Sequence, residues 1–484
     1  MPPLNKVSKT GRKTLATQIR RGVLWNVINL FVTRFLSVSV RLVLARVIVP
    51  HDFGIVAIMI AAIGLVMVFV DLGLKHALIQ RPRDRDFLIR FDSAFWLLAA
   101  VGIVTTLVFS FLAMPLIARL YGEPVMMTVG YAMSWSILFQ SLSIIPLVRL
   151  LRRLRYRSVV IAEVISMVVS SALALALAYA GAGVWSLVAQ QLLLFASKTA
   201  ILWYLCRWRP RARFSVRALK DIVPFGVSAY GVKITQYLRV RSDTFTVGFI
   251  LGSSALGLYT MAHLLTEVVR AALAAVVGKI LLPAMSKVQG DDHEVARIFC
   301  GATRSISLLV FPVSIALHLH ADSVVRQLFN SEWYGMIAPA RILAWSGIVY
   351  AAGGPIEQLF QATGRPKILF QLYATNFVLV TLPTIILLTK FHGLSGTAYA
   401  VVIGMIVLRA RMQWSIFRHY PGVSKGMISA VKPAILIASL CFVLNPILGE
   451  TVHVFIKISI YFFLFYSLVA YSLRVHLPRI TAKR

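Results

Sequence analysis

The chain has 484 residues, of which 59% are hydrophobic and only 14% charged, and its formal net charge is +33. Soluble domains are typically about a quarter charged, so this composition excludes an ordinary water-soluble protein and favours one whose apolar side chains face lipid. The three cysteines, Cys206, Cys300 and Cys441, are far apart in the sequence, which excludes a disulfide framework and a four-cysteine zinc site, and we expect no cofactor.

Apolar segments of the length that a bilayer-spanning helix needs, about 20 residues, follow one another along the chain. Lipid offers the backbone no hydrogen-bond partner, so each of them is expected to be helical. The fold class predicted is therefore an all-α integral membrane protein with about fourteen transmembrane helices. The segments are 23–45, 54–73, 91–118, 125–148, 159–180, 184–205, 222–251, 255–285, 298–319, 338–362, 368–389, 394–416, 427–448 and 453–474.

The placement of Lys and Arg supports this segmentation. Of the 50 basic residues, 34 fall in the two tails and in alternate connections on one side, four fall in connections on the other side, and 12 lie within helices. The positive-inside rule then predicts an even number of helices and both termini in the cytoplasm. The same distribution explains the net charge, so we expect no nucleic-acid partner.

A basic interruption at 206–221 follows the first six helices and suggests two halves. ARVIVPHDFGIVAIM (45–59) aligns without gaps to GFILGSSALGLYTMA (248–262), at an offset of 203 residues that corresponds to six helices. A parallel repeat of this kind is typical of transporters with two related lobes. The predicted organisation is a basic cytoplasmic tail (1–22), an N-terminal six-helix lobe (23–205), a basic cytoplasmic linker (206–221), a C-terminal six-helix lobe (222–417), two further helices (427–474) and a cytoplasmic tail (475–484).

Ionisable residues inside the predicted helices are the candidates for function, because each costs several kcal/mol unless it faces water or a partner. Arg34 and Arg41 lie seven residues apart, which places both on one face of the first helix. The seventh helix carries Lys233 and Arg241, eight residues apart, and also Asp243. Further candidates are His263, Glu267 and Arg270, at i, i+4 and i+7 of the eighth helix, and Glu357 in the tenth.

Two interpretations of these charges remain open. The basic residues outnumber the acidic ones, and guanidinium groups bind diphosphate oxygens in pairs of hydrogen bonds, so the excess fits an anionic cargo. Alternatively, Asp243 pairs with Arg239 within its own helix, and Glu357 hydrogen-bonds a neighbouring helix.

Strings at the helix ends carry a family resemblance. They are LARVIVPHDFGIVAI (44–58), ALIQR (77–81), DSAFWL (92–97), GAGVWSLVAQQLL (181–193) and RSDTFTVGFILGSSALGLYTMA (241–262). In this order and spacing they resemble the Wzx-type polysaccharide exporters of the colanic-acid and succinoglycan branch, which belong to the multidrug/oligosaccharidyl-lipid/polysaccharide flippase superfamily. The resemblance covers most of residues 20–420.

The resemblance implies two six-helix lobes in a V shape like that of the multidrug exporters of the superfamily, with two C-terminal helices added. It also implies a transporter rather than an enzyme, located in the bacterial inner membrane. Such a protein moves an undecaprenyl-diphosphate-linked oligosaccharide to the outer leaflet by alternating access, for exopolysaccharide or lipopolysaccharide synthesis. The expected partners are that substrate and the phospholipid bilayer, and the resemblance leaves room for other polysaccharide-assembly proteins.

Relatives that move diphosphate-linked lipids have a cationic central cavity with arginines on the first and eighth helices. The substrate-binding residues expected here are Arg34, Arg41, Lys233, Arg241 and Arg270. The candidates for a coupling ion or an ion pair are Asp243, Glu267, Glu357 and His263.

Two alternatives compete with this interpretation. A multidrug exporter of the same superfamily would need net acidic residues in the lobes, whereas the embedded charge here is basic. A membrane-embedded polysaccharide polymerase or ligase would need a sizeable outside loop with catalytic Arg or His, and the longest one, 318–339, is short.

Overall fold

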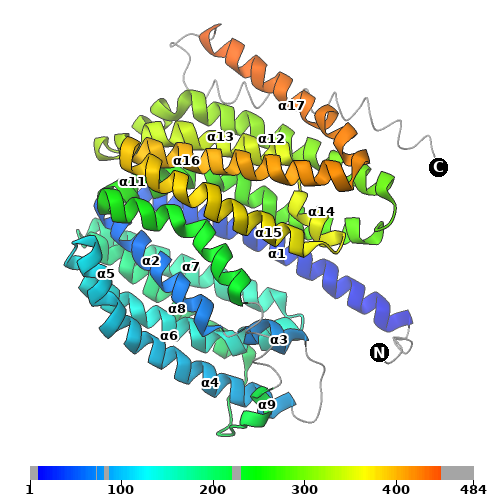
Figure 1. The fold of residues 1–484 in the computed structure, drawn as a ribbon. Coiled ribbons are helices and arrows are strands. Elements are labelled where there is room, and N and C mark those ends of the chain that lie inside the picture. Colours follow the sequence, from blue (N-terminus) through cyan, green and yellow to red (C-terminus); the bar gives the residue numbers. More distant parts are fainter. Residues whose placement is uncertain (1–8, 72, 81–86, 221–229, 448–484) are drawn as a thin grey trace. The chain divides into compact units, whose positions relative to one another are not determined.

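The structure is a computed structural model, and it describes residues 9–71, 73–80, 87–220 and 230–447 (Figure 1). Within these ranges every regular element is a helix. The predicted helix at 453–474 and the tail at 475–484 lie outside the described residues.

The chain divides by its internal contacts into two compact units, Met1–Ser253 (unit 1) and Ser254–Arg484 (unit 2). The lobe boundaries predicted above stay a prediction. In unit 1 the helices are α1 (Lys9–Leu44), α2 (Pro50–Val70), α3 (Leu74–Gln80), α4 (Phe87–Val108), the π-helical η1 (Phe109–Ala113), α5 (Met114–Tyr121), α6 (Val125–Arg152), α7 (Tyr156–Tyr179), α8 (Val184–Cys206) and α9 (Val216–Lys220).

Helix α11 (Tyr230–Lys287) begins in unit 1 and ends in unit 2. The other helices of unit 2 are α12 (Asp292–Leu328), the 3₁₀ turn η2 (Ser331–Met336), α13 (Ile337–Gly353), α14 (Ile356–Ala362), α15 (Pro366–Asn376), the π-helical η3 (Phe377–Thr381), α16 (Leu382–His419) and α17 (Pro421–Ile447).

The described residues contain ten helical stretches that are long and apolar enough to cross a membrane. Two of them, 233–267 and 367–418, each hold a glycine with non-helical backbone, Gly252 and Gly393. These glycines lie where the sequence predicts one helix to end and the next to begin. The helical membrane architecture is therefore confirmed, while the number fourteen stays a prediction.

The break at Gly252 has a local cause. Its φ of +83° lies in the region that glycine adopts at little cost and other residues avoid. The neighbouring residue, Ser253, touches the start of α2, where a Cβ on Gly54 would come 1.8 Å from the Ser253 carbonyl oxygen. Glycine at position 54 thus allows two backbones to approach closely at this end of unit 1.

Within each unit, helices pack side by side (Figure 1). In unit 1, α7 packs against α1 and α8, and α6 packs against α4 and α8. In unit 2, α12 packs against α13 and α17, and α13 packs against α16. The first helix is longer than predicted, because α1 starts at Lys9 and so includes part of the expected basic tail.

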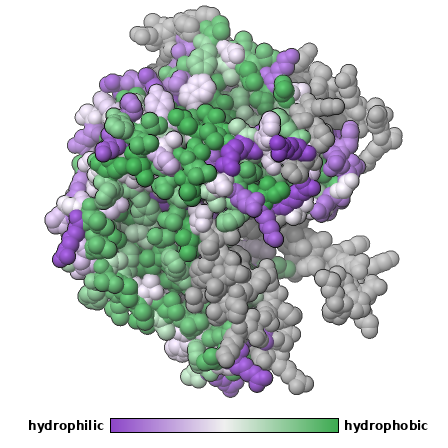
Figure 2. Space-filling model, in the orientation of Figure 1, coloured by the Kyte–Doolittle hydropathy of each residue, from purple (hydrophilic) through white to green (hydrophobic). Residues whose placement is uncertain are grey.

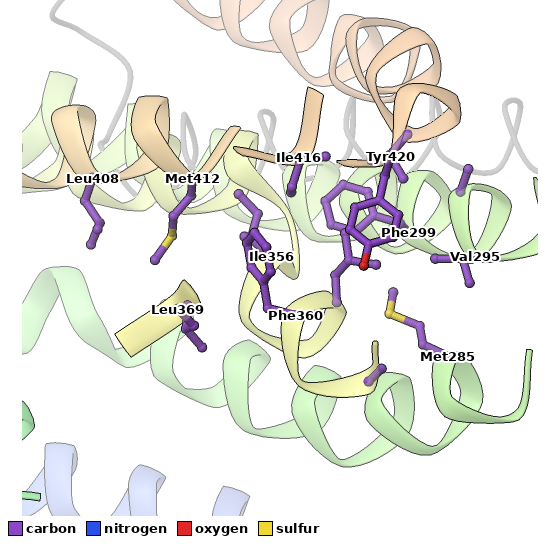
Figure 3. Close-up of a cluster of buried hydrophobic side chains, with 14 residues drawn as sticks. Met285, Val295, Phe299, Ile356, Phe360, Leu369, Leu408, Met412, Ile416 and Tyr420 are labelled. Atoms are coloured by element: carbon purple, nitrogen blue, oxygen red, sulfur yellow. The ribbon is translucent and has the colours of Figure 1, made fainter. Parts of the chain in front are cut away.

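A short helix organises one core of unit 2. Figure 3 shows Ile356 and Phe360 of α14 in the middle of a buried cluster, between Met412 of α16 and Phe299 of α12. All four side chains are fully buried. The cluster fixes α14 directly after the chain turns at Gly354, and thereby fixes the position of Glu357 as well.

The helix surfaces are apolar over large areas, as Figure 2 shows for the face in view. Phe35, Phe111 and Leu379 are 77%, 72% and 71% exposed. Exposed side chains of this kind on long helices are what a lipid-facing surface requires.

Candidate functional site

Three arginines of unit 1 lie close together. Arg34 and Arg41 come from α1 and Arg241 from α11, and both Arg34 and Arg241 are near enough to Arg41 to repel its charge. All three side chains are accessible to solvent, although protein atoms surround Arg41 on most sides. We call them the cationic cluster.

The cationic cluster needs a polar environment. A guanidinium at membrane depth costs several kcal/mol in lipid, so exposed arginines within a span face water or a polar ligand. Mutual repulsion among three like charges adds to that cost and is relieved by an anion. The arrangement is therefore suited to bind a compact group with two or more negative charges.

Tyr237 positions Arg241, which lies one helical turn farther along α11. The Tyr237 hydroxyl donates to the carbonyl oxygen of Ala61 in α2 at 2.7 Å and also accepts a hydrogen bond from the Arg241 side chain. A Cβ on Gly64 would come 2.2 Å from that hydroxyl. Glycine at position 64 thus leaves room for the tyrosine to reach α2.

Lys233 is engaged in an ion pair with a residue that the sequence analysis did not single out. Its Nζ lies 3.0 Å from Oδ2 of Asp71, which follows α2. The Oδ1 atom of Asp71 is buried and has no hydrogen-bond partner among the described residues. The charge of Lys233 is largely compensated by Asp71, and its role in substrate binding stays a prediction.

A shallow, open depression with a volume of about 340 Å³ lies beside this pair. It is lined by Val68, Lys233, Gln236, Tyr237 and Val240. Most of its lining is aliphatic or aromatic, with the Lys233 ammonium, the Gln236 amide and the Tyr237 hydroxyl as polar groups.

A second polar group of unit 1 joins three helices. Glu163 of α7 accepts a hydrogen bond from Asn29 Nδ2 of α1 at 2.6 Å and another from Lys198 Nζ of α8 at 2.8 Å. Both oxygens of the carboxylate are used, one by each partner. All three residues are half-buried.

The candidates on the second part of α11 lie in unit 2. His263 Nδ1 is 3.1 Å from Oε2 of Glu267, one turn apart on the same helix, and both side chains are half-buried. The side chain of Arg270 lies outside the described residues, so its assignment to the binding set stays a prediction.

Glu357 is part of a hydrogen-bonded group in unit 2. Its Oε1 accepts from the Tyr373 hydroxyl at 2.7 Å and from Arg409 Nη2 at 3.3 Å. The Arg409 guanidinium lies over the Tyr350 ring, 4.8 Å from its centre. Arg409 is only 9% exposed, so this arginine is held by a carboxylate and an aromatic face rather than by solvent.

Asp243 is buried near the end of unit 1. Its Oδ1 accepts from the backbone N–H of Thr244 at 2.7 Å and from the Thr244 hydroxyl at 3.3 Å. Among the residues that the structure describes, no group of three or more His, Cys, Asp or Glu side chains is placed to hold a metal ion. A coupling-ion role for Asp243, Glu267, Glu357 or His263 stays a prediction.

The residues that sequence reasoning missed are Asp71, Tyr237 and Asn29. Asp71 follows an apolar helix, where a carboxylate looks like an ordinary connection residue. The pairs Lys233–Asp71 and Asn29–Glu163 join residues 162 and 134 positions apart. Helical spacing carries no signal for contacts between different helices. The embedded position of Lys233 and of Glu163 was the available indication that each needs a partner.

Comparison with known proteins places the chain among polysaccharide-assembly proteins. A family model described as "Polysaccharide biosynthesis protein" matches residues 43–338. The lipopolysaccharide biosynthesis protein WzxC of Escherichia coli K12 is 24% identical over 393 residues, which are 80% of this chain and 78% of WzxC. The succinoglycan biosynthesis transport protein ExoT of Rhizobium meliloti 1021 is 23% identical over 428 residues, which are 87% of this chain and 84% of ExoT.

Among solved structures, the fold is similar to that of the lipid II flippase MurJ in an inward closed conformation. The TM-score is 0.78 at 14% sequence identity, and the alignment covers 94% of this chain and 100% of the MurJ chain. Because the sequence identity is this low, the structural similarity is evidence for the fold alone.

Proposed function

The chain belongs to the polysaccharide biosynthesis protein family, and from this premise we propose that it is a transporter that flips an undecaprenyl-diphosphate-linked oligosaccharide across the bacterial inner membrane. The relatives WzxC and ExoT, which match most of its length, carry names that refer to polysaccharide biosynthesis and transport. The fold, shared with a lipid II flippase, supports the same class of cargo.

The cationic cluster is the observation that carries the proposal. A lipid-linked sugar of this class has three parts that require different environments: a prenyl chain, a diphosphate and an oligosaccharide. Arg34, Arg41 and Arg241 supply forked donors that match diphosphate oxygens. The prenyl chain can stay in lipid while the sugar occupies the aqueous region that the arginines already require.

The charge of the cluster also separates this proposal from export of cationic drugs. Three neighbouring guanidinium groups repel a cation by the same interaction that attracts a diphosphate. The carboxylate of Asp71, directly after α2, would attract a cation, but it is already paired with Lys233.

The orientation and the transport cycle complete the proposal. The concentration of basic residues in alternate connections supports cytoplasmic termini. Loading then takes place from the cytoplasmic leaflet and release at the outer leaflet, by alternating access.

The test is leaflet-resolved transport in vesicles reconstituted with the purified full-length protein. Arg41→Ala and Arg241→Ala are compared with Arg119→Ala, an exposed arginine at the end of α5. Removing one charge-assisted contact should slow translocation of the lipid-linked diphosphate about tenfold or more, while Arg119→Ala should transport as the unchanged protein does. Equal rates for all three variants at equal protein content would refute a role of the cationic cluster. Absence of translocation by the unchanged protein would refute the flippase assignment itself.

A further inference from the structure

The connection after α8 alternates strictly between arginine and apolar residues. Its sequence from Arg207 to Phe214 is RWRPRARF. Between α8 and α9 this segment forms no helix. The backbone turns at both ends of this run, because Arg207 has a left-handed φ of +48° and the Arg213 N–H donates to the Arg211 carbonyl oxygen at 2.7 Å. The four arginines at the odd positions, which we call the linker arginines, are Arg207, Arg209, Arg211 and Arg213.

All four linker arginines are exposed. Trp208 and Pro210 between them are half-buried, whereas Ala212 and Phe214 are exposed like the arginines. Trp208 stacks on Trp203 of α8 with ring centres 5.8 Å apart and meets Phe95 of α4 edge-on at 6.0 Å. Trp208 therefore attaches the segment to unit 1, and the arginines are left facing outward.

Helix α4 holds the backbone of the segment in place. The Trp96 indole Nε1 donates to the Arg211 carbonyl oxygen at 2.9 Å, and the Arg211 N–H donates to Asp92 Oδ1 at 3.4 Å. Two residues beyond Arg213, the Ser215 N–H donates to the Ser93 hydroxyl oxygen at 2.9 Å. These contacts use main-chain atoms of the segment, so the guanidinium groups extend from a backbone that is anchored to α4.

Neighbouring side chains indicate the depth of the segment in the membrane. Tyr204, in the last turn of α8, is 76% exposed, and Phe214 and Val216 at the other end of the segment are 55% and 59% exposed. Tyrosine and tryptophan near helix ends mark the layer of lipid headgroups. Exposed apolar side chains on both sides of four arginines fit the same layer, where acyl chains and phosphates meet.

We propose that the linker arginines form a binding site for the phosphate groups of anionic phospholipids in the cytoplasmic leaflet. The inference rests on the orientation given under the proposed function, and it does not depend on the cargo. Guanidinium forks pair with phosphate oxygens in a bidentate manner. Four such groups on one anchored segment can bind more than one headgroup. Phospholipids are favoured over a soluble phosphate because Phe214 and Val216 can insert among acyl chains while the arginines bind the phosphates.

The experiment compares two charge-matched variants of the full-length protein. One carries Arg209→Gln, Arg211→Gln and Arg213→Gln, and the control carries Arg46→Gln, Arg119→Gln and Arg326→Gln, which remove the same charge from connections on the opposite side. Each protein is placed in nanodiscs of phosphatidylcholine with increasing phosphatidylglycerol. Retained phosphatidylglycerol is then measured by native mass spectrometry after release from the nanodisc.

A basic residue close to an anionic surface contributes a factor of about five in affinity. The linker variant should therefore need on the order of 100-fold more phosphatidylglycerol for equal retention, while the control variant should match the unchanged protein. A variant with lysine at positions 209, 211 and 213 should show an intermediate loss, because it keeps the charge but not the fork. Melting temperatures of the variants show whether they are folded. If the triple variant does not fold, the single substitution Arg209→Gln replaces it, with an expected loss of about fivefold in affinity for phosphatidylglycerol.

Two outcomes would overturn the proposal. The first is equal phosphatidylglycerol retention by the linker variant and the unchanged protein. If that variant also loses the lipid-linked diphosphate added to the same nanodiscs, the linker arginines belong to the substrate site instead. The second is an equal loss in the control variant, which would show that net charge alone is responsible. None of these readouts requires transport, so a failure here is distinct from a failure of the proposed function.

Discussion

Asn29 of α1 donates a hydrogen bond of 2.6 Å to Glu163 of α7, and this contact fixes the rotation of the helix that carries Arg34 and Arg41. The two arginines follow Asn29 by five and 12 residues. At 3.6 residues per turn they point roughly 140° and 120° away from it. When Asn29 is bound to α7, the arginines therefore face away from α7.

A charge exchange tests whether Glu163 acts through this geometry. Glu163→Lys places two ammonium groups together and should reduce transport strongly, by about tenfold or more. The double variant Glu163→Lys with Lys198→Glu restores the ion pair. The Asn29 amide can then accept through its oxygen from the new ammonium group at position 163, because an amide both donates and accepts. We expect the double variant to recover most of the transport rate. If it stays as inactive as the single variant, Glu163 itself takes part in transport, for example by carrying a proton.

Gly64→Ala should displace Tyr237 from α2. The new methyl group would lie 2.2 Å from the Tyr237 hydroxyl, so the hydrogen bond to the Ala61 carbonyl would be lost and Arg241 would move with the tyrosine. We expect a clear drop in transport with little change in the amount of protein in the membrane. Gly301→Ala is the control, since a Cβ there has no neighbour within 4 Å. It should leave transport unchanged and raise helix stability slightly, by about 0.5–1 kcal/mol. Equal transport by both variants would contradict the role of Tyr237.

Asp71→Asn should strengthen binding of the anionic substrate. The substitution removes the negative charge that compensates Lys233, so the positive potential around the cationic cluster rises. Binding of the lipid-linked diphosphate to the purified protein, measured by intrinsic fluorescence over a range of salt concentrations, should become several-fold tighter and more sensitive to salt. Asp322→Asn, which removes an exposed carboxylate paired with Arg326, is the control for net charge. Weaker binding by Asp71→Asn would show that the pair with Lys233 is needed to shape the site.

The effects of substitutions at Glu357 and at Arg409 on the free energy of unfolding should be strongly coupled. Removing one member of a buried ion pair leaves the other charge uncompensated, at a cost of about 3–5 kcal/mol in fully buried cases. Arg409→Met and Glu357→Gln should therefore each lower the melting temperature in detergent, even though the amide oxygen in Glu357→Gln can still accept from Tyr373. The double variant should be more stable than the sum of the single effects predicts. The exposed pair Asp322–Arg326 is the matched control and should show no measurable coupling. Additive effects at Glu357 and Arg409 would mean that their contact adds nothing to stability.

The sequence was sufficient for the features that depend on local pattern. Hydropathy located the helices, and the predicted gaps after residues 251 and 389 coincide with the non-helical glycines Gly252 and Gly393. The seven-residue spacing of Arg34 and Arg41 placed them on one face, and the structure adds Arg241 beside them. These properties follow from helix geometry and from the cost of charge in lipid, both of which act on neighbouring residues.

The sequence was insufficient wherever the partner comes from another helix. Nothing in the sequence indicated that Asp71 is the partner of Lys233, and contact of Lys233 with substrate stays a prediction. For Glu357 the sequence leaves open an ion site or a hydrogen bond to a neighbouring helix, and Tyr373 and Arg409 now provide partners for it. Such pairs depend on how helices are arranged side by side, which a periodicity of 3.6 residues does not encode.

Two anchors limit the length of the connection between Arg207 and Phe214. Connections between helices usually accept insertions of any length, but here Trp208 and the Arg211 backbone are held at fixed points on α8 and α4. Extra residues between those points would have to bulge outward or release one of the two anchors. Length changes in related chains should therefore fall outside the stretch from Trp208 to Arg211.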